Sequence, residues 1–131
     1  MSDLIITPIP AFKDNYIWLL TRGDEAAIVD PGDAAPVMQA LEQQQLRLAA
    51  ILATHHHADH VGGLVALKQR YPATAYGPAH ENVAQLDHRL AAGDKIDVLG
   101  TRFEVIDIPG HTAGHIAFFA AGLKPPAVFC G

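Results

Sequence analysis

The residues best suited to chemistry form one short cluster. Residues 54–60 read Thr-His-His-His-Ala-Asp-His, so His55, His57, Asp59 and His60 place four potential metal ligands within six positions. In an extended segment, residues two apart point the same way, which predicts that His55 and His57 bind one ion together. The side chains of Asp59 and His60 should point in a different direction, and these two residues are predicted to bind a neighbouring ion. Imidazole and carboxylate ligands suit Zn²⁺, Fe or Mn.

Two metal ions a few ångströms apart can share a hydroxide, which is a strong nucleophile at neutral pH. The cluster therefore favours metal-dependent hydrolysis, which needs no serine or cysteine nucleophile. The alternatives are chance clustering, an expression tag and solvated histidines in a turn. With this chain's own His and Asp frequencies, the pattern arises by chance in roughly one chain of 500. The cluster is also internal and follows an apolar segment, residues 48–53, that is typical of a buried strand.

A second segment, residues 109–115, reads Pro-Gly-His-Thr-Ala-Gly-His. His111 again follows a predicted strand and a Pro-Gly turn, and it could supply the third imidazole of the first ion. His115 is predicted to support the site rather than to bind metal, and Thr112 to hydrogen-bond behind the ligands.

Other candidate residues are weaker. His56 should point away from its neighbours in the cluster, and His80 and His88 are predicted to face solvent. Cys130 lies in an apolar run and is predicted to be a small buried residue. Asp30, at a predicted strand end, could orient the metal loop or cap the following turn, and the sequence does not decide between these roles.

The elements that must position these residues alternate between strands and helices, which predicts α/β layers in one domain over residues 1–131. Strands are expected at 4–7, 16–21, 26–30, 48–53, 74–77, 103–108, 116–119 and 127–130. Helices are expected after residue 33, after Gly63 and over 79–86.

Composition narrows the class of protein. The chain has 131 residues and a formal net charge of −5, and its Lys and Arg are scattered, so a nucleic-acid partner is disfavoured. One cysteine cannot form an intrachain disulfide. The N-terminal residues lack a signal-peptide pattern, and no apolar run is long enough to span a bilayer. A cytoplasmic protein without a membrane partner is expected, and the oligomeric state stays open.

The motif His-x-His-x-Asp-His after an apolar strand, with Pro-Gly-His-Thr about 50 residues later, resembles the metallo-β-lactamase superfamily. Further segments narrow the resemblance to glyoxalase II, the hydroxyacylglutathione hydrolases, over essentially the whole chain. These segments are residues 14–20, 29–33, 54–63, 76–81, 93–115 and 128–131.

The resemblance implies an αβ/βα sandwich with a two-metal site at one edge, of which this chain holds only the first half. It implies that His55, His57 and His111 bind the first metal. Asp59 and His60 are implied as ligands of the second metal, with Asp59 also orienting the hydroxide as a catalytic residue.

In this family an aspartate that bridges the metals follows the segment like 128–131. A further histidine ligand and a helical region that helps to hold glutathione come later. The resemblance therefore implies that the second metal site is incomplete in this chain.

The implied reaction is hydrolysis of S-acyl glutathione thioesters, such as S-lactoylglutathione to lactate and glutathione, by a hydroxide that bridges two divalent ions. Zn²⁺ is favoured, with Fe or Mn as alternatives. Other functions stay open: a lactamase, an iron-dependent sulfur dioxygenase, an RNA-processing nuclease, or a truncated and inactive metal-binding fragment.

Overall fold

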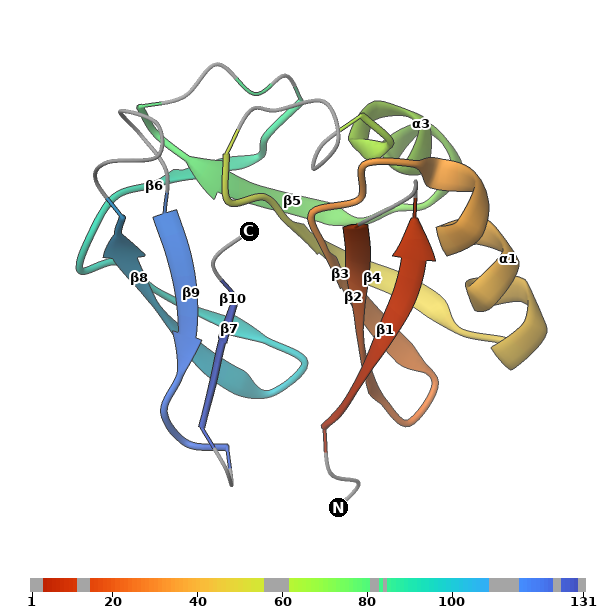
Figure 1. The fold of residues 1–131 in the computed structure, drawn as a ribbon, viewed down its shortest axis with the longest axis horizontal. Coiled ribbons are helices and arrows are strands. Elements are labelled where there is room, and N and C mark those ends of the chain that lie inside the picture. Colours follow the sequence, from red (N-terminus) through yellow and green to blue (C-terminus); the bar gives the residue numbers. More distant parts are fainter. Residues whose placement is uncertain are drawn as a thin grey trace.

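The computed structural model describes residues 4–11, 15–55, 62–80, 83, 85–108, 116–123 and 126–129. The elements in these residues are β1 (Ile5–Ala11), β2 (Asn15–Arg22), β3 (Glu25–Val29), α1 (Ala34–Gln44), β4 (Arg47–Leu52), α3 (Leu64–Arg70), β5 (Thr74–Pro78), β6 (His88–Leu90), β7 (Lys95–Val98), β8 (Thr101–Asp107), β9 (Ile116–Ala120) and β10 (Ala127–Phe129). The described strands form a six-stranded sheet, in the order β1-β2-β3-β4-β5-β6, and a four-stranded sheet, in the order β10-β9-β8-β7. Figure 1 shows the two sheets side by side.

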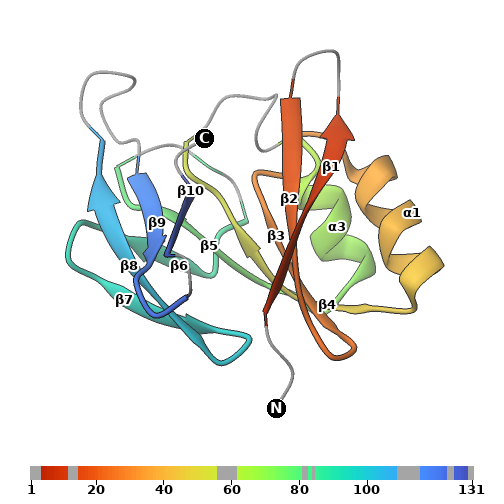
Figure 2. The same cartoon turned by 60° about the horizontal axis from the view of Figure 1, so that its bottom comes forward.

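The larger sheet is mixed. Strands β1, β2 and β3 pair antiparallel, whereas β3 to β6 pair parallel. A parallel pair needs a crossover connection, most often through a helix. Helix α1 lies between β3 and β4 in the chain, α3 lies between β4 and β5, and both cover one face of the sheet (Figure 2). The predicted α/β class is therefore confirmed.

Both faces of the larger sheet are buried, and this produces two hydrophobic cores. On β2, Leu19 packs toward the helices and Leu20 toward the smaller sheet; on β4, Ile51 and Leu52 divide in the same way. Successive strand residues point to opposite faces, so an apolar run serves both cores at once. This explains why residues 48–53 are apolar throughout rather than alternating. Each such buried side chain contributes about 1.5–3 kcal/mol relative to exposure.

Helix α1 begins where the sequence predicts it. The Asp33 side chain accepts a hydrogen bond from the backbone N–H of Ala35, and buried Val37 and Leu41 form the face that packs on the sheet. The helix ends where Gln45 adopts a left-handed conformation, with a φ of 54°, which satisfies carbonyls at the helix terminus.

The helix predicted at residues 79–86 is wrong for the part of that segment that the structure describes. Ala79, His80, Val83, Gln85 and Leu86 are all outside helical structure. Gln85 has a φ of 69°, which a right-handed helix does not allow. The short strands β6 and β7 were also not predicted from the sequence.

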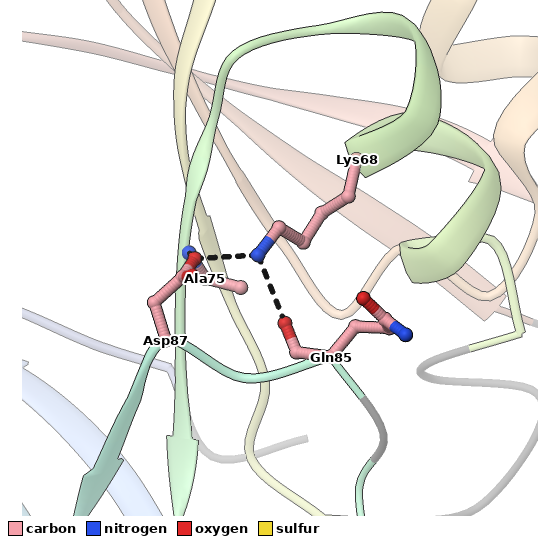
Figure 3. Close-up of polar contacts among 4 residues, drawn as sticks. All are labelled: Lys68, Ala75, Gln85 and Asp87. Atoms are coloured by element: carbon pink, nitrogen blue, oxygen red, sulfur yellow. Dashed lines mark hydrogen bonds and ion pairs between the residues drawn. The ribbon is translucent and has the colours of Figure 1, made fainter.

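A polar contact fastens α3 to the connection between β5 and β6. The Lys68 ammonium donates to Asp87 Oδ2 at 2.6 Å and to the Gln85 carbonyl at 3.1 Å, while the Ala75 N–H donates to the same carboxylate oxygen at 2.8 Å (Figure 3). The hydrogen bond from Lys68 and then that from Ala75 hold the pKa of Asp87 below its ordinary value. The contact therefore anchors α3, which starts shortly after the histidine cluster in the chain, to the connection between β5 and β6.

We expect Asp87→Asn to lower the free energy of unfolding by about 0.5 kcal/mol, a figure discounted because the Asp87 side chain is 43% exposed. A lowered folded-state pKa stabilises the fold above the unfolded value, near pH 4, and this stabilisation disappears as pH falls through the folded value. The difference between wild type and variant should therefore be largest near neutral pH. Urea titrations at several pH values measure it. Asp97→Asn is the control, since its 3.4 Å pair with Arg102 is largely exposed, and an equal loss in this control would contradict the assignment.

Strand β10 is one of the two edge strands of the smaller sheet in the described residues, and Val128 on it is 54% exposed. An exposed apolar edge strand offers unpaired backbone groups to another chain. We expect the 131-residue chain to self-associate in sedimentation experiments and Val128→Lys to reduce the association. Val65→Lys, at an exposed helical valine, is the control and should change little. A wild-type chain that sediments as a monomer at all concentrations would refute this expectation.

Candidate metal centre

Three strand ends meet at one edge of the sandwich. Beyond the end of β3, the Asp30 N–H donates to the Leu52 carbonyl of β4 at 2.8 Å. Beyond β4, the Thr54 carbonyl accepts from the N–H of Ile116, the first residue of β9, at 3.0 Å. The carboxyl ends of β3 and β4 and the start of β9 therefore share one edge (Figure 1), where ligand sites of layered α/β folds are usually built.

Thr54 is the residue that joins these ends. Its backbone N–H donates to Asp30 Oδ1 and its hydroxyl to Asp30 Oδ2, both at 2.8 Å. Thr54 and Asp30 are 0% and 4% exposed. Asp30 has a φ of 53°, a left-handed conformation that aspartate tolerates better than most residues.

His55 is 1% exposed, and its Nδ1 lies 2.8 Å from Thr54 Oγ1. The second ring nitrogen, Nε2, is buried as well. A histidine that binds metal through one ring nitrogen and hydrogen-bonds through the other is the usual arrangement in metal sites. The buried, oriented imidazole of His55 therefore fits a metal ligand, with Nε2 as the nitrogen that the Thr54 contact does not occupy.

The other predicted site residues lie outside the described residues. These are His57, Asp59, His60 and His111 as ligands, with His56, Thr112, His115 and Cys130 as the further candidates. In the described part of the chain, no three His, Cys, Asp or Glu side chains gather as a metal site. Their ligand roles stay predictions, but the bond between Thr54 and Ile116 brings together the residues that flank the two predicted ligand segments.

The structure bears on the predictions for Asp30, His80 and His88. The carboxylate of Asp30 binds Thr54, whereas the helix cap that follows is supplied by Asp33. The structure thus favours orientation of the metal loop as the role of Asp30. His80 and His88 are exposed as predicted, although His88 also stacks on Tyr76 with ring centroids 5.0 Å apart.

Gly63, which follows the histidine cluster in the chain, is held by the backbone as well. The Gly63 N–H donates to the Pro31 carbonyl at 2.7 Å. A Cβ added at Gly63 would lie 2.5 Å from the backbone nitrogen of Ala34 and 2.8 Å from the Pro31 oxygen. The segment after β3 therefore holds both ends of the predicted ligand loop, through Asp30 on one side and Pro31 on the other. Sequence reasoning missed this role of Gly63, although the Gly62-Gly63 pair was its signal.

A cavity of about 470 Å³ lies at the opposite edge of the sandwich, beside Glu25, Thr74 and Asp97. Arg22 borders it and joins the two sheets, because its guanidinium donates to the Leu99 carbonyl and to Thr101 Oγ1. The cavity has both charge signs and no histidine, so it does not belong to the metal centre.

None of the helices in the described residues is long and apolar enough to cross a membrane.

Residues 12–124 match the family model of the metallo-beta-lactamase superfamily, and the chain belongs to this superfamily. Its predicted sandwich fold is confirmed by a TM-score of 0.82 to the crystal structure of BLEG-1 B3 metallo-beta-lactamase, at 25% identity over 97% of this chain and 71% of that chain. The crystal structure of ETHE1 from Myxococcus xanthus is also similar, with a TM-score of 0.76 and 26% identity over 89% of this chain and 54% of that one.

The predicted resemblance to hydroxyacylglutathione hydrolases is also confirmed. The chain is 54% identical to the hydroxyacylglutathione hydrolase of Dechloromonas aromatica (strain RCB), over 98% of this chain and 47% of that protein. It is 52% identical to the one of Chromohalobacter salexigens, over 98% of this chain and 51% of that protein. The chain spans about half the length of the curated relatives it matches.

We expect Gly63→Ala to destabilise the fold by about 1–3 kcal/mol, because the obstacles to a new Cβ are backbone atoms that cannot rotate away. Gly122→Ala is the matched control, since nothing lies within 4 Å of a Cβ there, and it should change stability by less than about 0.5 kcal/mol. Chemical denaturation of both variants measures the difference. Equal stability of the two would show that the 31–34 turn does not restrain this end of the loop.

Proposed function

We propose that this chain carries the first metal site of a glyoxalase II-type hydrolase, which cleaves S-acyl glutathione thioesters such as S-lactoylglutathione. One observation carries the proposal: the buried His55, oriented by Thr54, lies at the edge where β9 begins with Ile116. The family match and the relatives named hydroxyacylglutathione hydrolase support this choice.

In this proposal His55, His57 and His111 hold the first divalent ion, and Asp59 and His60 belong to the second. Zn²⁺ is favoured because imidazole and carboxylate ligands suit it, with Fe or Mn as alternatives. When bound, such ions supply a hydroxide at neutral pH and polarise a carbonyl. The chain's own part is to bring the ligands together, with Asp59 also orienting the nucleophile.

The proposed partner is a small glutathione thioester in the cytoplasm, with no nucleic acid and no membrane. Since the chain spans about half the length of its relatives, the activity belongs to the whole protein in this proposal. The 131-residue chain retains three predicted ligands for the first ion and two for the second. Three protein ligands plus water form an ordinary zinc site, so we expect about one tightly bound ion per chain and weak turnover.

Metal analysis of the 131-residue chain tests the ligand assignment. His57→Ala and His111→Ala should lose the bound Zn²⁺, because each removes one of the three predicted ligands. His88→Ala should keep it, since this exposed side chain contacts Tyr76 and is not a predicted ligand. Equal zinc content in the His57 and His88 variants would disprove the assignment.

Thioester kinetics test the activity. Hydrolysis of S-lactoylglutathione should be weak in the 131-residue chain and strong in a chain of the relatives' full length, which should also bind a second ion. No hydrolysis by the full-length chain would exclude the thioesterase and leave a lactamase, a sulfur dioxygenase or an inactive metal-binding protein. Two tight ions and full turnover in the 131-residue chain would show that the ligand set proposed here is incomplete.

A further inference from the structure

We propose that Asp30, acting through Thr54, fixes the tautomer of His55, so that the proton sits on Nδ1 and Nε2 presents a lone pair to the metal. Asp30 and Thr54 are positioning residues in this proposal and do not touch the ion. The inference rests on the proposed metal centre and adds the mechanism by which its buried ligand is prepared.

The direction of each hydrogen bond follows from counting protons. A carboxylate only accepts, and Asp30 lies 2.8 Å from both the Thr54 nitrogen and the Thr54 hydroxyl oxygen. Thr54 therefore donates its single hydroxyl proton to Asp30. The same oxygen lies 2.8 Å from His55 Nδ1, and toward this nitrogen it has only lone pairs to offer. Nδ1 must then be the donor, and a neutral imidazole has its lone pair on the other nitrogen.

Because these residues are buried, their hydrogen bonds select one tautomer of His55. Thr54, His55 and Asp30 are at most 4% exposed, so water cannot readily replace a hydrogen bond that points the wrong way. Hydrogen bonds in such surroundings are stronger than in water, and a mismatched one is more costly. In solution the ring of a neutral histidine can carry its proton on either nitrogen, whereas here one form is selected before any ion arrives.

The backbone holds Asp30 in place for this role. Its N–H donates to the Leu52 carbonyl at 2.8 Å, and its own carbonyl accepts from Gly32 at 2.9 Å. These bonds hold a left-handed residue with a φ of 53°, a conformation that costs on the order of 1 kcal/mol outside glycine. Asparagine also tolerates this conformation. The isosteric substitution Asp30→Asn can therefore test the direction of the hydrogen bonds from Asp30 through Thr54 to His55 without a change of backbone.

Asp30→Asn should reverse the direction of the hydrogen bonds that link residue 30, the Thr54 hydroxyl and His55 Nδ1. The Thr54 N–H still needs an acceptor, so the oxygen of the introduced amide takes that place and its NH₂ group faces the Thr54 hydroxyl. The hydroxyl then accepts from the amide and donates its proton to His55 Nδ1. The His55 proton moves to Nε2, which can no longer bind metal without a change of tautomer.

The experiment is a long-range ¹H–¹⁵N NMR spectrum of the metal-free 131-residue chain at about pH 8, where histidine is ordinarily neutral. Its pattern distinguishes the two neutral tautomers, and comparison with His55→Ala assigns the His55 signals. We expect the Nδ1–H form in the wild type and the Nε2–H form in Asp30→Asn. Zinc affinity, measured by competition with a chelator, should fall about 10–100-fold in Asp30→Asn.

Two variants of Thr54 provide the controls. Thr54→Ser keeps the hydroxyl and should retain the Nδ1–H form and the zinc affinity. Thr54→Val keeps the shape but removes the hydroxyl, and it should give a mixture of tautomers. If Asp30 and Thr54 had a purely structural role, their variants would lose stability without a change of tautomer. Thermal melts of every variant therefore show whether a variant has unfolded.

An Nε2–H form in the wild type would overturn the inference, as would an unchanged Nδ1–H form in folded Asp30→Asn. Either result would leave the proposed metal centre standing, because zinc binding is measured separately. If the tautomers behave as expected but the wild-type chain binds no zinc, the proposed metal centre is refuted while the hydrogen-bond direction is upheld.

Discussion

The two hydrogen bonds from Thr54 to Asp30 are the interaction on which the arrangement of this edge depends. They connect the segments beyond β3 and β4, and the carbonyl of Thr54 extends the connection to β9 in the other sheet. A β-strand ends wherever its ladder of hydrogen bonds stops, so its last residues would otherwise fray. Here a single residue uses its N–H, its carbonyl and its hydroxyl to join three segments. The position of His55, the next residue, is set by that junction.

The junction is polar and buried, and such groups are unfavourable unless their hydrogen-bonding capacity is met. The two hydrophobic cores on either side offset this cost. The helix-side core contains Ile28 and Ile51, and the inter-sheet core contains Val29 and Leu52, so the same strands that carry the junction bury apolar groups on both faces. Packing on both faces supports the strands that carry the junction, and such support is what a ligand side chain needs if it is to be held within a fraction of an ångström.

Much of this fold follows from the sequence, for reasons that particular residues make clear. The apolar run 48–53 and the cap at Asp33 identify β4 and α1, because burial on two faces and a side-chain cap each leave a local pattern. The helix expected at 79–86 failed because the chain there is set by distant contacts, such as those of Lys68 with Gln85 and Asp87. The strand β6 is three residues long, too short for any periodicity to show.

In the candidate site, too, some features follow from the sequence and others depend on distant contacts. Residue types and spacing predict the ligands, since metal chemistry restricts them to a few side chains. They do not reveal which nitrogen of His55 has a hydrogen-bond partner, because that partner is the Thr54 oxygen 2.8 Å from Nδ1, and this oxygen contacts Asp30, which is 24 residues away from Thr54 in the chain.

This dependence suggests why the predicted ligands follow strand ends rather than occupying the strands. Side chains within β4 pack into the two cores, whereas His55 lies just beyond the junction, and its ring contacts the hydroxyl of Thr54. Gly63 lies against Pro31, so the residues on both sides of this predicted ligand segment, Thr54 and Gly63, are held by the chain that follows β3. In the proposed metal centre the segment supplies the ligands, while the strands, the two cores and a few buried hydrogen bonds fix the described residues on either side of it.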